Sequence, residues 1–135
     1  MACAAGKTGT MTPAVFAALC VAGGVGAALR FVVDGLVRSR VRSVFPWGTA
    51  IINVSGSLLL GFLTGLTLHA LLPPPWVLVL GTGMMGGYTT FSTASIETMR
   101  LVQEREYVMA ATNGFAVLIV TVAVGFGSLW VGSSL

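Results

Sequence analysis

The most constraining feature of this sequence is residues 76–96, a stretch without a single charged side chain. An apolar run of about 20 residues is long enough to cross the hydrocarbon core of a bilayer as a helix. The centre of this run carries a glycine pair and then four hydroxyl residues, namely Gly86, Gly87, Thr89, Thr90, Ser92 and Thr93. Glycine is a poor helix residue, and non-helical backbone inside a membrane is tolerated only within protein or beside water. The run therefore predicts either a span broken over residues 86–90 or an unbroken span that packs closely through small residues.

The composition indicates an integral membrane protein with little mass outside the bilayer. Hydrophobic residues make up 56% of the chain and charged residues 8%, whereas soluble domains carry roughly 25% charged residues. The length suits one all-α domain of four spans over residues 13–135, and we expect residues 1–12 to form a disordered tail. The two cysteines, Cys3 and Cys20, fit neither a disulfide framework nor a metal site.

Hydropathy, together with the charged loops and the proline turn between the apolar runs, places the four spans at about residues 13–37, 48–72, 76–99 and 107–131. Pro13 can begin the first helix, because the first turn leaves its N–H groups unpaired in any case. The glycines of residues 23–27 favour a helix-packing surface over the alternative, a signal-peptide cleavage site. Arg30 and Asp34 stand four residues apart on one helical face, so we expect that they can pair.

The second span carries small and polar residues at every fourth position, namely Thr49, Asn53, Ser57, Gly61, Gly65 and His69. This spacing aligns them along one stripe of a helix. A full amide in hydrocarbon is costly unless it is hydrogen-bonded, so Asn53 should face protein or water. Two interpretations remain open: the stripe joins neighbouring helices, or it lines an ion pathway.

The distribution of basic residues predicts the orientation in the membrane. The loops after the first and third spans hold five arginines, namely Arg38, Arg40, Arg42, Arg100 and Arg105, with Arg30 close by. Lys7 is the only basic residue on the side that holds the termini and the turn at residues 73–75. The positive-inside rule then places both loops in the cytoplasm and both termini outside the cell membrane.

Enzymatic chemistry is not expected from this sequence. Asp34 is the only aspartate and His69 the only histidine, so no Ser-His-Asp set can form. The spans hold no paired carboxylates and no His/Cys metal cluster, and no basic, aromatic-interleaved patch indicates a nucleic-acid partner. A proton-coupled transporter normally needs an ionisable residue in its spans. The remaining interpretations are a passive pathway through the membrane and a role in helix packing. In either case membrane lipid surrounds the protein.

Three motifs resemble the CrcB/Fluc fluoride channels, in order and at the family's spacing. They occupy residues 23–31 (GGVGAALRF), 46–57 (PWGTAIINVSGS) and 86–93 (GGYTTFST). The resemblance implies a small four-span channel that exports the fluoride ion passively. It also implies an antiparallel dimer with two pores, a third helix broken at mid-membrane and a structural Na⁺ at the dimer centre.

The resemblance assigns roles to individual residues. The backbone carbonyls of Gly86 and Thr89 match the Na⁺ ligands, and Arg30 matches a vestibule arginine that attracts anions. The residues that match the fluoride pathway are Thr49, Asn53, Phe91, Ser92, Thr93 and Asn113. An aromatic ring has a positive edge, so an edge turned to the pore can stabilise an anion.

The sequence also departs from the family pattern. Ala94 stands where the family has a second pore phenylalanine, and Val117 stands where it has a fourth-span serine, which Thr121 would replace only after a shift of one turn. Together with the one-sided arginines, these losses favour one half of a heterodimer over a homodimer. The alternative functions are a small multidrug-type cation exporter, which needs a membrane-embedded carboxylate, and a non-conducting partner subunit.

Overall fold

The computed structural model describes residues 11–135; most of the expected disordered tail, residues 1–10, lies outside the described part. Helix α1 spans Pro13–Arg40 and α2 spans Trp47–Leu68. The third span consists of α3 (Pro74–Val77), the π-helical η1 (Leu78–Met85), α4 (Gly86–Tyr88) and α5 (Phe91–Gln103). The last span consists of α6 (Tyr107–Ala111), the π-helical η2 (Thr112–Ala116) and α7 (Val117–Ser133).

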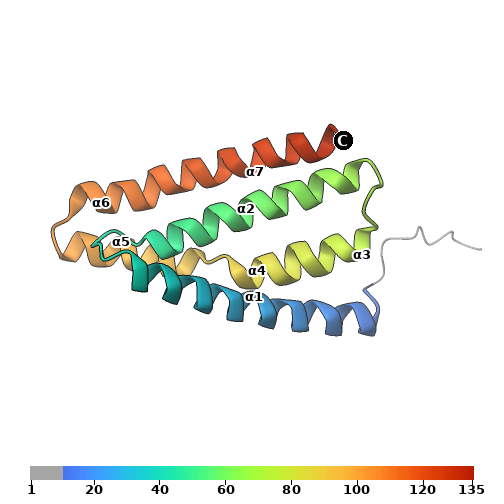
Figure 1. The fold of residues 1–135 in the computed structure, drawn as a ribbon, viewed down its shortest axis with the longest axis horizontal. Coiled ribbons are helices and arrows are strands. Elements are labelled where there is room, and N and C mark those ends of the chain that lie inside the picture. The colour runs from blue at the N-terminus through green and yellow to red at the C-terminus, as the bar shows by residue number, and fades with distance from the viewer. Residues whose placement is uncertain (1–10) are drawn as a thin grey trace, which may run out of the picture.

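The expected all-α, four-span architecture is confirmed. Three continuous helical stretches are long and apolar enough to cross a membrane, namely Pro13–Arg40, Trp47–Leu68 and Tyr107–Ser133. The third span crosses in two pieces, and the ribbon between α4 and α5 is visibly extended (Figure 1). The start of α1, the turn before α3 and the C-terminus lie at one end of the bundle, and the two arginine-bearing loops lie at the other (Figure 1).

Helix α1 begins where the sequence predicts. Pro13 occupies its first turn, and the Val15 N–H donates a hydrogen bond to Thr12 Oγ1 (3.2 Å). A threonine in this position pairs one of the N–H groups that a helix start leaves without a backbone partner. Arg38 and Arg40 lie in the last turn, where positive charge complements the helix dipole. The helix is thus fixed at both ends by its own sequence.

Helices α2 and α7 form the closest pair in the bundle, and glycine makes that approach possible. A Cβ atom on Gly65 would lie 2.5 Å from the Leu129 carbonyl oxygen, and one on Gly132 would lie 2.6 Å from that of Phe62. Gly61 lies equally close to the Gly125 backbone. Small residues let membrane helices pack backbone to backbone, so part of the second-span stripe serves packing.

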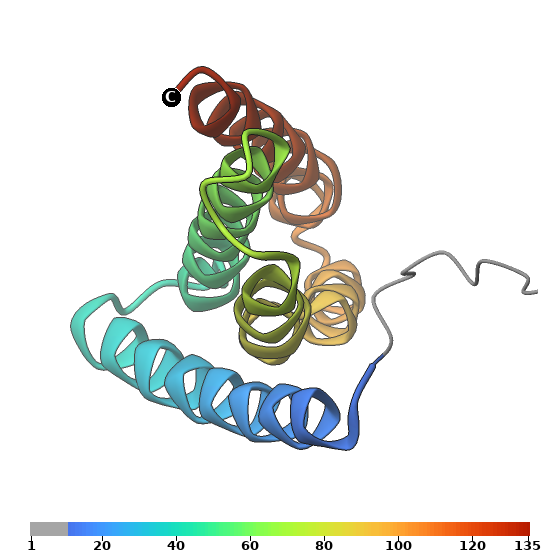
Figure 2. The ribbon, with the colours of Figure 1, turned by 90° about the vertical axis from the view of Figure 1, so that its right-hand side faces the viewer.

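The third span lies between α1 and the α2–α7 pair (Figure 2). Its glycines also serve packing: a Cβ on Gly83 would lie 2.9 Å from the Leu19 carbonyl oxygen, and one on Gly87 would overlap the Gly23 carbonyl. The prediction that the chain leaves the helix over residues 86–90 is confirmed for the last two residues only. Gly86 and Gly87 are helical, and the break lies at Thr89 and Thr90.

Candidate functional site

The break consists of two extended residues. Thr89 has φ −76° and ψ 159°, and Thr90 has φ −150° and ψ 122°. The Thr89 N–H still donates to the Met85 carbonyl (2.9 Å), so the first segment ends there. Thr90 then caps α5, because its Oγ1 accepts a hydrogen bond from the Thr93 N–H (3.2 Å). The chain restarts as a helix within two residues, with a capped N-terminus in the interior of the bundle.

Asn53 of α2 pairs with the backbone of the break. Its Nδ2 donates to the Thr90 carbonyl (2.9 Å), and its Oδ1 accepts from the Thr90 N–H (2.8 Å). Thr90 is buried, and an unpaired backbone group in hydrocarbon costs several kcal/mol. The amide therefore replaces the hydrogen bond that the Thr90 N–H lost at the break, donates to the Thr90 carbonyl as well, and joins two helices at the same time.

The break releases two carbonyl groups from their usual helical partners. In a continuous helix the Thr90 N–H would bond the Gly86 carbonyl, and the Thr93 N–H would bond the Thr89 carbonyl. Here the first N–H goes to Asn53 Oδ1 and the second to Thr90 Oγ1. Gly86 is exposed at the surface of the subunit, and an added Cβ there would meet nothing within 4 Å. The two carbonyls are those that the sequence matched to Na⁺ ligands, and the donor set suits a small hard cation.

A groove of about 510 Å³ lies beside the break. Its lining residues come from α2, the break, α5 and the last span, and include Asn53, Ser57, Thr89, Thr90, Phe91, Ala94, Thr98, Asn113, Val117 and Thr121. Phe91 borders the groove with 80% of its surface exposed. The structure thus brings Asn53, Phe91 and Asn113 together, although they are far apart in the sequence.

Asn113 lies in the π-helical segment η2 and is 4% exposed. Its Nδ2 donates to Thr98 Oγ1 (2.9 Å) and to the Ala94 carbonyl (3.2 Å). Short π-helical segments within longer helices are frequent at functional sites. Like Asn53, this amide ties the wall of the groove to the third span.

Val117 and Thr121 both line the groove, one helical turn apart. The Thr121 Oγ1 is buried and has no hydrogen-bond partner within residues 11–135. Most helical hydroxyls here bond to the preceding turn; the Thr98 hydroxyl, for example, donates to the Ala94 carbonyl (2.8 Å). Thr121 thus lines the groove without a register shift, but its hydroxyl oxygen is buried rather than open to the groove.

The remaining predicted pathway residues lie outside the groove. Ser92 and Thr93 gather around the Thr90 hydroxyl, whose Oγ1 lies 3.4 Å from Ser92 Oγ and 3.0 Å from Thr93 Oγ1. Thr49 is 2% exposed in the first turn of α2. Arg30 is half-buried on α1 and lines neither the groove nor the second cavity, described next.

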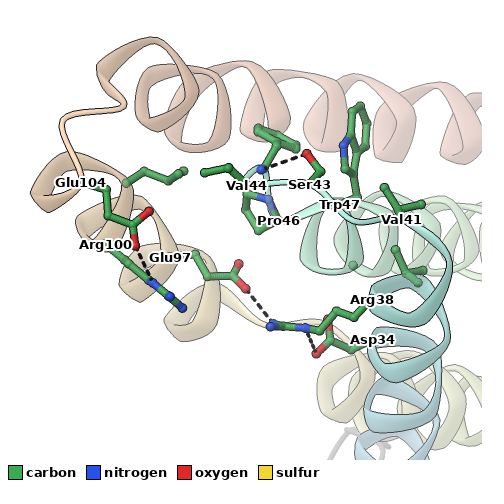
Figure 3. Close-up of a pocket in the computed structure, with 14 residues that line it drawn as sticks. Asp34, Arg38, Val41, Ser43, Val44, Pro46, Trp47, Glu97, Arg100 and Glu104 are labelled. Carbon is green, nitrogen blue, oxygen red and sulfur yellow. Dashed lines mark hydrogen bonds and ion pairs between the residues drawn. The ribbon is translucent and has the colours of Figure 1, made fainter.

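A second cavity of about 260 Å³ lies at the end of the bundle with the arginine-bearing loops (Figure 3). Arg38 stands at its edge between two carboxylates: its Nε lies 2.8 Å from Asp34 Oδ2, and its Nη2 lies 3.2 Å from Glu97 Oε1. The expected pair of Arg30 with Asp34 does not form. Asp34 pairs one turn onward instead, because Arg38 can also reach Glu97 of α5.

Sequence reasoning missed the importance of Thr90. It named Thr90 in the motif but gave it no role, whereas its backbone is the partner of Asn53 and its hydroxyl caps α5. The available signal was the threonine itself, a residue type that is favoured at the start of a helix. The role of Arg38 had no comparable local signal, because Glu97 is 59 residues away.

Comparison with known proteins places this architecture in a family. A family model described as CrcB-like protein, Camphor Resistance (CrcB), matches residues 17–133. The fluoride-specific ion channel FluC 1 of Leifsonia xyli subsp. xyli is 49% identical over 122 residues, which cover 90% of this chain and 89% of the relative. The fluoride-specific ion channel FluC 2 of Mycobacterium tuberculosis H37Rv is 41% identical, with 90% of each chain covered. The corresponding FluC protein of Thermococcus kodakarensis is 43% identical over 110 residues, 81% of this chain and 88% of the relative.

These matches confirm the resemblance stated from the sequence motifs. They cover all four spans, both sides of the Thr89–Thr90 break and the residues of the groove. The chain is a multi-pass membrane protein, and its family is a family of channels rather than enzymes. It belongs to the CrcB/FluC family of fluoride-specific ion channels.

Proposed function

We propose that this chain is a subunit of a passive fluoride channel in the cell membrane, and that the groove beside the Thr89–Thr90 break carries the ion. The observation that supports this most strongly is the pairing of Asn53 with both backbone groups of Thr90, at 2.8 and 2.9 Å. This pairing holds an opened helix beside a groove at mid-membrane. Irregular backbone at this depth is typical of ion pathways.

The groups around the groove suit a small, strongly hydrated anion, which needs hydrogen-bond donors in place of water. An amide carries two N–H groups; the Asn53 amide uses one on the Thr90 carbonyl, and the other remains for the ion. The Thr121 side chain also lines the groove, and its buried hydroxyl has no partner within the described chain. The positive edge of the exposed Phe91 ring adds favourable electrostatics. Ser92 and Thr93 extend the polar surface toward the arginine-bearing end, Thr49 lies buried in the first turn of α2 at that end, and Arg30 attracts anions to the entrance.

The carbonyls of Gly86 and Thr89 would hold the Na⁺ that the family resemblance implies. The fit rests on the hydrogen bonds of the break, which direct the Thr90 and Thr93 N–H groups to side chains. Gly86 also lies at the exposed surface of the subunit, where a second subunit could contribute the same atoms. A bound cation would supply positive charge close to the anion path and would join the two subunits.

We propose further that the subunits form an antiparallel dimer and that this chain is one half of a heterodimer. Its basic residues lie almost wholly at one end, so nearly every copy should insert with both termini outside. An antiparallel partner must then carry its basic residues at the opposite end, so that it inserts in the opposite orientation. Ala94 and Val117, which replace an aromatic ring and a hydroxyl, both line the groove. A partner that retains these groups would complete one pore with Phe91, and we expect one conducting pore per dimer.

The test is fluoride efflux from liposomes that contain the purified chain, alone and co-assembled with a family member whose basic residues lie on the opposite side. We expect efflux from the mixed assembly, little from the chain alone, and termini on one side of the membrane. Robust efflux from the chain alone, with termini on both sides, would rule out the heterodimer. An assembly that folds and never conducts would identify a non-conducting partner subunit.

The alternative of a cation exporter has little support. It needs an available carboxylate inside the membrane, and Asp34 bonds Arg38 near the end of α1. Measuring efflux of an organic cation in the same liposomes, driven by a proton gradient, would detect this activity.

A further inference from the structure

The second cavity contains more negative than positive side chains. Three carboxylates and two guanidinium groups line it, namely Asp34, Glu97 and Glu104, with Arg38 and Arg100 (Figure 3). Arg100 pairs with Glu104 (3.0 Å). The start of α2 and residues 41–46 contribute only uncharged or apolar lining. Arg38 is therefore the one cation that faces both Asp34 and Glu97 among the cavity-lining residues.

Arg38 is the ion-pair partner that the two carboxylates share. The side chains of Glu97 and Asp34 are 15% and 30% exposed. Each offers one oxygen to Arg38, and the other oxygen, Asp34 Oδ1 or Glu97 Oε2, is buried without a hydrogen-bond partner in residues 11–135. The Arg38 side chain itself is 61% exposed, but removing it leaves two largely buried carboxylates without the counter-charge they share, which is unfavourable.

The cavity lies at the end of the polar face of α5. Thr90, Thr93, Glu97, Arg100 and Glu104 follow one another at spacings of three and four residues, which places them along one helical face. The face begins at the break, where the Thr90 and Thr93 hydroxyls bond each other (3.0 Å). Thr90 lines the groove and Glu97 lines the second cavity, so an anion that followed this face out of the groove would meet Glu97. Without a counter-charge, the two carboxylates would repel it, and such repulsion is strong where water is scarce.

We propose that Arg38 is a charge-balancing and positioning residue for anion passage at this end of the channel. It neutralises Asp34 and Glu97, and it draws the Glu97 carboxylate toward α1 and away from the polar face of α5. The proposal rests on the proposed fluoride function. It also gives Arg38 a different role from Arg40 and Arg42, which form no ion pair within residues 11–135.

The test compares Arg38→Gln with Arg42→Gln, since both remove one positive charge from the same end of the bundle. Fluoride efflux per folded dimer is measured in the conducting wild-type assembly and in each variant. Arg38→Gln should lower efflux by about tenfold or more, which corresponds to about 1.4 kcal/mol on the barrier. Arg42→Gln should stay close to wild type, and Arg38→Lys, which keeps the charge, should retain most of the efflux.

Neutral variants separate charge balance from a merely structural tie between α1 and α5. The triple variant R38Q/D34N/E97Q should recover most of the efflux, and D34N/E97Q should conduct at least as well as wild type. The D34N/E97Q variant keeps the test decisive if Arg38→Gln does not fold. Full efflux from Arg38→Gln, or tenfold loss in D34N/E97Q, would overturn the proposal. A wild type that conducts in no assembly would instead refute the fluoride function, and this proposal with it.

Discussion

The α2–α7 pair and the third span contain similar small residues but differ in whether the helical backbone is interrupted. Both are rich in glycine, and both place glycines where an added Cβ would strike a neighbouring backbone, as at Gly65 and Gly87. Yet α2 continues unbroken to Leu68, whereas the third span opens at Thr89 and Thr90. Glycine therefore sets how closely the helices approach in both regions and does not by itself open either one.

The difference lies in the hydrogen-bond partners that replace the helical ones. At the break, Asn53 pairs with both backbone groups of Thr90, and the Thr90 hydroxyl caps the next helix. At the α2–α7 contact, hydroxyls bond their own helix instead, as Ser128 does with the Gly125 carbonyl (3.0 Å). A span opens inside a membrane where side chains from a neighbouring helix satisfy the released groups. This comparison leads to three predictions.

Of these three predictions, the largest effect is expected from crowding the α2–α7 contact. Gly65→Ala places a Cβ 2.5 Å from the Leu129 carbonyl oxygen and 2.8 Å from Gly132 Cα. Because both neighbours are backbone, the helices must move apart, at a cost of about 1–3 kcal/mol. Thermal unfolding in detergent should show a clearly lower midpoint and less folded protein.

Gly127→Ala on α7 is the matched control, since an added Cβ there meets nothing within 4 Å. It should leave the unfolding midpoint unchanged or slightly higher, because alanine is the better helix former. Equal midpoints for the two variants would show that close backbone approach does not govern this contact.

The second effect concerns function with little change in stability. Phe91 is 80% exposed in the subunit and borders the groove. Phe91→Ala should lower fluoride efflux by about tenfold, equivalent to about 1.4 kcal/mol on the barrier, and should leave the unfolding midpoint near that of wild type. Phe115→Ala is the control: Phe115 is 71% exposed and is not among the groove-lining residues. Similar efflux from both variants would exclude Phe91 from the ion path.

The smallest effect is expected from restoring a hydroxyl to the groove wall. Val117→Ser adds a hydrogen-bond donor one turn before Thr121. Since the groove already holds other donors, efflux should rise by only about two- to threefold, less than 1 kcal/mol on the barrier. Initial efflux rates at matched protein density measure this change. A fall in efflux would show that the apolar wall at Val117 is required.

The sequence predicts the four spans because uncharged runs of membrane length leave few other structures. It also predicts that the third span is broken, and it selects Asn53 as a costly amide in need of a partner. The predicted range for the break wrongly includes the glycine pair, which is helical, because a glycine needed for close packing and a glycine that ends a helix look alike in one chain. The structure distinguishes them by what surrounds Gly87.

Pairings between distant elements were beyond local reasoning. Asp34 has an arginine four residues before it and another four residues after it, and the acid-before-base order on a helix favours the second. The structure pairs Asp34 with Arg38, whose guanidinium also binds Glu97, a residue that the fold brings alongside. In the same way, Asn53 as a helix-joining residue and Asn53 as a pathway residue were separate interpretations. The structure shows that the amide joins two helices, which is compatible with the proposed pathway role.

The most direct test of the account is fluoride efflux per folded dimer in Asn53→Ala, measured together with the unfolding midpoint. The substitution leaves the Thr90 N–H and carbonyl without their partners, which should cost about 1–3 kcal/mol for each group. The account predicts a lower midpoint and a loss of efflux of about thirtyfold or more, equivalent to about 2 kcal/mol on the barrier. Wild-type efflux per folded dimer, whatever the midpoint, would contradict the claim that the Asn53–Thr90 pairing forms part of the fluoride pathway.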